Sequence, residues 1–190
     1  MDIVSDLMKE AGTGDNLSLI SNTVGGDGNA VRSALGMSLP VVMGSLAATA
    51  AKPGGAGVLT TMVSQAGSSS PAGNLSGYLG SPAAAGGSSM VSTLFGSHLA
   101  PVQDAIARKT GLPPAVVGKV LEIAVPMVIG FVGKIAGGQN LDAAGLAGLI
   151  GDQSKMALAG SPDAAAVMEQ MVVSQAASGG LSGMMKNMLG

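Results

Sequence analysis

The sequence predicts an all-α protein, and three observations support this fold class. Apolar residues make up 47% of the 190 residues, and they recur mostly at spacings of three or four, with little period-2 alternation. Aromatic residues make up only 2%, so Ala, Val, Leu and Met supply the core. The 31 glycines allow helices to approach closely, and the 13 methionines can fill irregular gaps between them. We therefore expect helices packed through small side chains.

An internal repeat organises the predicted helices. Residues Val31 to Gly44 align with Val117 to Gly130, and Val, Leu, Pro, Val and Gly recur in register. Further matched pairs are Ile20 with Ile106 and Gly25 with Gly111. Chance alignment of two stretches rich in Ala, Gly and Val is the alternative, but the shared interior proline favours duplication. The sequence thus predicts two pseudo-repeated three-helix units.

The second unit shows how each helix is specified. A short helix from Pro101 to Thr110 ends at Gly111, and Pro113-Pro114 begins the next helix, because proline is suited to the first turn. The helix that begins at Pro113-Pro114 has an apolar stripe, and Pro126 is expected to kink or break this helix. Pro40 is expected to kink or break the long helix of the first unit in the same way. Third helices are predicted at about 56–65 and 141–150.

The chain divides into four predicted segments. The first helical unit covers 1–65 and includes an N-terminal helix with a solvated acidic face. A linker rich in Gly, Ser and Ala covers 66–98; it is mostly irregular up to Ser89, with one short helical turn near Leu75. The second unit covers 99–160. A Met-rich helical tail covers 161–190 and begins at Ser161-Pro162-Asp163, a typical helix start.

Charge and cysteine content exclude several classes of function. Charged residues make up 11%, the net charge is −2, and no charge occurs from Pro53 to Gln103. This gives no electrostatic footprint for nucleic acid or an anionic membrane. A thinly charged surface favours self-association, although the uncharged stretch also suits a solvated linker. Without cysteine or a basic N-terminal signal, the sequence indicates a cytoplasmic protein, and the apolar stretch Ser33 to Ala51 is expected to be a core helix.

Several segments resemble the bacterial domain of unknown function 937 family. They are Met90 to His98 leading into Ala105 to Leu112, the helices around Leu39-Pro40 and Val125-Pro126, and the segment Leu141 to Leu146. The resemblance covers about 15–152 and is carried by apolar residues, Pro and Gly. It implies an all-helical, non-enzymatic protein and brings no catalytic residues or cofactor.

The residues themselves offer no catalytic or metal chemistry. His98 is the single histidine, and it is expected at a helix end or core edge because no nucleophile elbow accompanies it. A zinc site would need three or four suitable ligands. The glycine clusters lack both the dinucleotide fingerprint and the Ser or Thr of a phosphate loop. We therefore expect neither an enzyme nor a bound cofactor or metal.

The favoured function is association, most simply with a second copy to form a homo-oligomer. Its candidate surface is the Met-rich tail, since flexible methionines suit adaptable interfaces; the candidate residues are Val167, Met168, Met171, Val172, Met184, Met185 and Met188. The alternative is a helix-turn-helix-like regulator that contacts nucleic acid through Arg108, Lys109 and Lys119. The start of its second helix is poor in basic and amide residues, which disfavours it.

Overall fold

The computed structural model describes residues 2–67, 75–79 and 86–173, and these form helices and turns without a strand. The all-α prediction is confirmed. The helices are α1 (Ile3–Ala11), α2 (Gly14–Val24), α3 (Gly28–Ala50), α4 (Gly55–Gly67), α5 (Leu75–Leu79), α6 (Gly86–Phe95), α7 (Leu99–Thr110), α8 (Pro114–Gly138) and α9 (Ala143–Ala159), with a 3₁₀ turn η2 (Gly96–His98). A last helix is described over 162–173.

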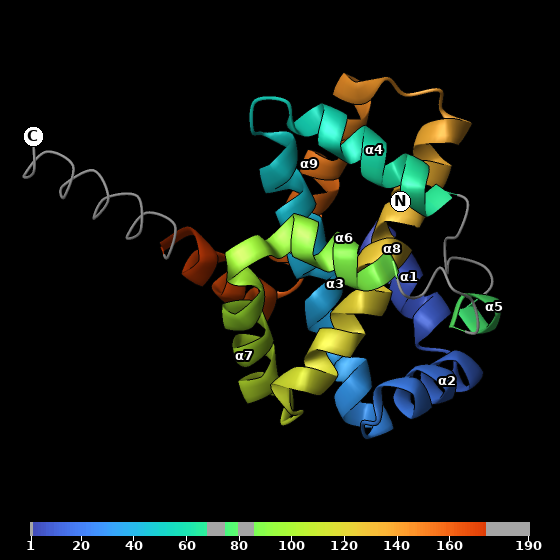
Figure 1. Ribbon diagram of the computed structural model, residues 1–190, viewed down its shortest axis with the longest axis vertical. Helices are drawn as coiled ribbons and strands as arrows, with labels where there is room; N and C mark the ends of the chain where they lie inside the picture. Colours follow the sequence, from blue (N-terminus) through green and yellow to red (C-terminus); the bar gives the residue numbers. More distant parts are fainter. Residues whose placement is uncertain (1, 68–74, 80–85, 174–190) are drawn as a thin grey trace, which may run out of the picture.

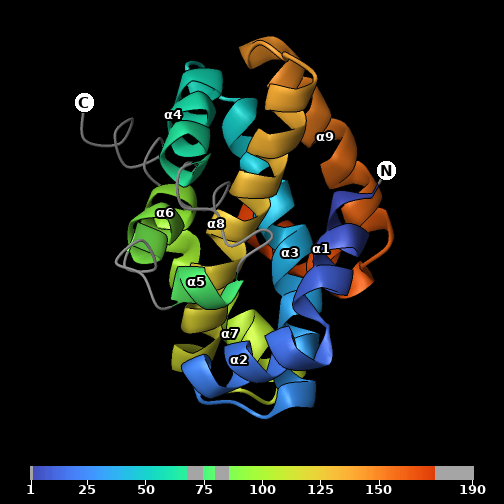
Figure 2. The same cartoon turned by 90° about the vertical axis from the view of Figure 1, so that its right-hand side faces the viewer.

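The two longest helices, α3 and α8, pack against each other at the centre of the molecule (Figure 1). Figure 2 shows α4 and α6 on one side of this pair and α1 and α9 on the other. Both central helices are apolar over most of their circumference, as expected of helices surrounded by other helices. Length and composition alone would let each cross a membrane, but 67% of the apolar window of α3 and 72% of that of α8 is buried inside the molecule.

Local sequence sets the ends of these helices. Gly25 and Gly111 end α2 and α7 in the left-handed conformation, with φ of 78° and 74°. Pro114 is the first residue of α8, so the predicted end at Gly111 and start at Pro114 are confirmed. The prolines were predicted to kink or break their helices; neither helix breaks, since α3 runs on through Pro40 and α8 through Pro126, and a kink at each proline stays a prediction. The packing of neighbouring helices holds each proline inside its helix.

The order α2–α3–α4 recurs as α7–α8–α9. Pro40 and Pro126 lie 86 residues apart, and so do the positive-φ turn residues Gly54 and Asn140. The third helix of each half packs more extensively on the long helix of the other half, α4 on α8 and α9 on α3. The halves therefore share one continuous core. Their superposition stays a prediction.

The predicted linker contains more helix than expected wherever it is described. The short turn near Leu75 is α5, and α6 begins at Gly86, where irregular chain was expected up to Ser89. The apolar face of α6 supplies Val91 and Phe95 to the core, both 2% exposed. Residues 68–74 and 80–85 lie outside the described ranges.

Candidate functional site

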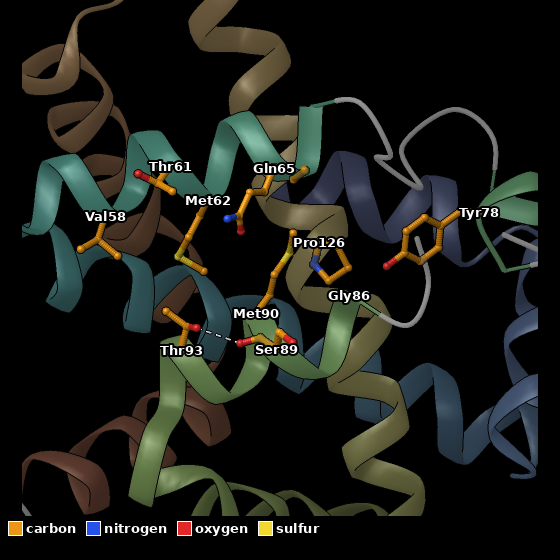
Figure 3. Close-up of a pocket in the computed structure, with 11 residues that line it drawn as sticks. Val58, Thr61, Met62, Gln65, Tyr78, Gly86, Ser89, Met90, Thr93 and Pro126 are labelled. Atoms are coloured by element: carbon orange, nitrogen blue, oxygen red, sulfur yellow. Dashed lines mark hydrogen bonds between the residues drawn. The ribbon is translucent and has the colours of Figure 1, made fainter. Parts of the chain in front are cut away.

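An apolar groove lies between α4 and α6, above Pro126 of α8 (Figure 3). Its volume is about 450 Å³, within the range of small-molecule sites in proteins. Met62 extends from α4 and Met90 from α6 toward the centre of the groove. The lining residues are Val58, Thr61, Met62, Gln65, Ala66, Tyr78, Gly86, Ser89, Met90, Thr93 and Pro126.

The groove has an apolar floor and a polar rim. Met62 is 4% exposed and Ala66 1%, and Pro126 is also buried. The rim residues Thr61, Gln65, Ser89 and Thr93 are exposed, and the Thr93 hydroxyl donates to the Ser89 carbonyl at 2.8 Å. Val58 is 41% exposed at one end of the groove. A buried apolar centre inside a polar rim is the usual anatomy of a protein interface.

The wall formed by α6 is seated on α8 at the proline. Pro126 has no N–H, so the Glu122 carbonyl loses its usual helical donor. Gly87 of α6 lies directly on this carbonyl group: a Cβ at Gly87 would overlap the Glu122 oxygen and lie 3.1 Å from the carbonyl carbon. The Ser88 hydroxyl also donates to Glu122 Oε1 at 2.6 Å. The absence of a side chain at Gly87 therefore sets how closely α6 approaches α8.

The wall formed by α4 also approaches α8 through a glycine. A Cβ at Gly133 of α8 would lie 2.7 Å from Cγ1 of Val63 on α4. Ridge-to-groove packing of two helices normally keeps their axes 8–10 Å apart, and small residues permit the near end of that range. Both walls of the groove thus pack closely on one central helix, α8, at positions where glycine has no side chain.

Tyr78 of α5 closes the far end of the groove and is 6% exposed. Burial raises the pKa of its phenol, and the negative charge of Glu122 raises it further. Tyr78 is the one titratable side chain among the described residues that line the groove. The lining is therefore uncharged at neutral pH and offers no general acid or base for catalysis there.

A second hollow, of about 260 Å³, lies on the other side of Thr93 and contains His98. Lys52 and Ser45 line it as well, together with Met168 and Met171 from the last helix. Its described lining contains no carboxylate, so a Ser-His-acid arrangement is not assembled there. No three His, Cys or acidic side chains of the described chain converge as metal ligands.

The last helix packs against its own chain, which changes the candidate association surface. Val167 is 4% exposed and Met171 8%, and both belong to the core. Met168 packs against Gly44, with its Cε 3.0 Å from the position of a Cβ there. Of these three predicted surface residues, Val167 and Met171 are buried in the core of the monomer and Met168 is partly buried against it. Val172 remains exposed at 62%, next to Val173 at 67%. Met184, Met185 and Met188 lie outside the described residues.

The three predicted nucleic-acid contacts lie on α7 and α8, each close to an acidic residue. Lys109 forms a 2.6 Å ion pair with Asp163, and both side chains are about half exposed. Arg108 lines a shallow hollow with Asp104, and Lys119 lines another with Glu122. Acidic neighbours lower the positive potential that phosphate binding requires. The helix-turn-helix alternative stays a prediction without support from this arrangement.

Sequence reasoning missed the groove, although one pattern pointed to it. Helices α4 and α6 both lie in the charge-free run from Pro53 to Gln103. That run was interpreted as linker or self-association surface, because Gly and Ser weaken the helical periodicity. Val58, Met62 and Ala66 recur at a helical spacing of four within this uncharged stretch, and this pattern could have predicted the α4 wall of the groove.

A comparison with known protein families gives one match. The sequence profile described as "Bacterial protein of unknown function (DUF937)" matches residues 6–135. The expected range was 15–152. The matched range starts nine residues earlier and ends 17 residues earlier, so Leu141 to Leu146 fall outside the match. No curated protein and no solved structure gives a significant match. Since the match spans more than half of the chain, from α1 into α8, the protein belongs to the DUF937 family of bacterial proteins of unknown function.

Proposed function

We propose that this protein is a non-enzymatic association module that forms homo-oligomers through apolar contacts. The observation that carries the proposal is the uncharged groove between α4 and α6, with its buried methionine and proline floor and its exposed polar rim. Grooves of this kind between two helices bind amphipathic helices, whose apolar residues enter the groove while the polar face stays in water.

The chemistry of the groove favours a protein partner over a charged metabolite. Its described lining has no group that is charged at neutral pH, so it offers no counter-charge for phosphates or carboxylates. Methionine side chains adapt to differently shaped apolar partners, which suits a protein contact. The hydroxyl and amide groups at the rim can hydrogen-bond to a partner backbone or side chain.

Self-association is favoured by the distribution of charge and exposed apolar residues. A net charge of −2 gives copies of this chain little mutual repulsion. Val172 and Val173 are exposed in succession where the described chain ends, and Val58 is exposed at one end of the groove. Exposed apolar residues grouped near the end of a helix are typical of a contact surface.

The test is the molar mass of the full chain by multi-angle light scattering across a concentration series. We expect a mass above the monomer value of 18.3 kDa that rises with concentration. A chain that ends at Val173 lacks the candidate association residues Met184, Met185 and Met188, so we expect it to be monomeric. Its helical circular dichroism per residue should be nearly unchanged, since the described core is retained. A full chain that stays monomeric at high concentration would refute the proposed function.

A further inference from the structure

We propose that the groove between α4 and α6 of one copy binds residues 181–189 of a second copy as an amphipathic helix. This inference rests on the proposed function and names its two contact surfaces. The groove lies within the described residues, whereas 181–189 lies outside them, and only the sequence of that segment is used.

The sequence of 181–189 has the anchor spacing of a groove-binding helix. Leu181, Met184, Met185 and Met188 stand at positions i, i+3, i+4 and i+7, which lie on one face of a helix. At 100° per residue, Lys186 falls on the opposite face, and Ser182 and Asn187 lie on the two flanks of the apolar face. Lys186 is the single charge in 174–190, so nothing charged would enter the groove.

The groove complements this segment in polarity. Neither α4 nor α6 contains a charged residue, so no ion pair selects a charged partner. The apolar floor suits methionine and leucine anchors, and the methionines Met62 and Met90 can adjust to them. The rim hydroxyls of Thr61, Ser89 and Thr93 flank the opening, where the polar face of a bound helix begins.

The exposed valines at the end of the described chain favour a second copy as the source, because the segment of the same copy would leave them uncovered. Figure 1 shows the last helix at the edge of the molecule, beyond α6 and α7. Seven residues, 174–180, then separate Val173 from Leu181. Val172 borders the hollow that shares Thr93 with the groove, so a second copy seated at the groove lies next to the exposed valines. One contact between copies then covers both exposed apolar features.

Because the protein has no cysteine, disulfide cross-linking can identify both the groove and the copy that fills it. One preparation carries Ser182→Cys, beside the apolar face of the segment. A second carries Thr61→Cys or Ser89→Cys, one on each rim of the groove, and a control carries Thr60→Cys, which is exposed on α4 outside the groove lining. The preparations are mixed, oxidised and resolved on a non-reducing gel. We expect mixed disulfide dimers at a rim position with at least tenfold the yield of the control.

A second measurement tests the groove without cross-linking. Val58→Glu places a charge at the groove, and its exposure of 41% makes the change compatible with folding. Thr60→Glu adds the same charge to the same helix outside the groove. We expect Val58→Glu to raise the dissociation constant of the oligomer at least tenfold, and Thr60→Glu to change it less than twofold. Circular dichroism verifies that both variants are folded.

The outcomes separate the two proposals. If the full chain is oligomeric and truncation at Val173 abolishes this, but Val58→Glu behaves like Thr60→Glu, the groove is not the receptor and the proposed function stands. If the mixed preparations give no dimer while a chain carrying both Ser182→Cys and Thr61→Cys closes an internal disulfide, the segment binds its own groove and the second copy is refuted. A full chain that is monomeric at all concentrations overturns both.

Discussion

Replacing Gly87 with alanine tests whether α6 is seated on the backbone of α8. Gly87 lies in α6 against the Glu122 carbonyl, and a Cβ there would overlap the oxygen and sit 3.1 Å from the carbon. Neither atom belongs to a flexible side chain, so α6 must shift. Forcing an extra carbon into a packed contact costs about 1–3 kcal/mol. The better helix propensity of alanine offsets at most about 1 kcal/mol of this cost.

The expected net result is a loss of about 1–2 kcal/mol in the free energy of unfolding, taking the central values of those two effects. For a chain of this size that corresponds to a decrease of roughly 2–8 °C in the melting temperature. Urea denaturation followed by circular dichroism measures the change. Gly86→Ala is the matched control, because nothing lies within 4 Å of a Cβ at that neighbouring position of α6.

Gly86→Ala should be neutral or slightly stabilising, since only the propensity gain acts there. If Gly87→Ala is as stable as Gly86→Ala, α6 does not rest on the Glu122 carbonyl and the account of the groove wall is wrong. A shift of α6 would also change the shape of the groove, because α6 forms one of its walls. Gly87→Ala should therefore also weaken oligomerisation if the groove is the contact surface.

Four further predictions follow from single contacts. A chain cut after Gly160 should lose about 3–6 kcal/mol of stability, because it removes buried Val167 and Met171, whereas a cut after Val173 should leave urea denaturation unchanged. Gln153→Leu should cost about 1–3 kcal/mol, because the Gln153 side chain accepts the buried Ile3 N–H at 3.0 Å; an unchanged urea midpoint would contradict this. Tyr78 is the single tyrosine, and absorbance at 295 nm should show its phenol titrating with a pKa above 10.0. Because the folded-state pKa is raised, the free energy of unfolding contributed by the neutral phenol is fully present below pH 10.0 and is lost as pH rises through the folded-state pKa. An experimental structure should superpose α2–α3–α4 on α7–α8–α9 with an offset of 86 residues, and prolines 40 and 126 at unlike positions would refute the duplication.

The sequence by itself determined the helical class and several helix ends, because these depend on local physics. Apolar spacing of three and four residues indicates a helix whatever its neighbours are. Gly111 can end α7 because it adopts a φ of 74° without steric cost, and Pro114 can begin α8 because the first residue of a helix needs no N–H donor. The family was likewise evident from short runs of apolar residues, Pro and Gly.

The tertiary structure decided which faces meet, and the groove exists only because of that choice. Spacing marks Val167 and Met171 as one apolar face, but only packing shows that this chain's own core covers it. The third helix of each half crosses to the opposite long helix, an arrangement that periodicity cannot distinguish from packing within a half. Pro126 shows the reason most clearly. Locally it predicts a kink or a break, yet α8 continues through it where surrounding helices bury it. Gly87, 39 residues away in sequence, covers the carbonyl that Pro126 leaves without a donor.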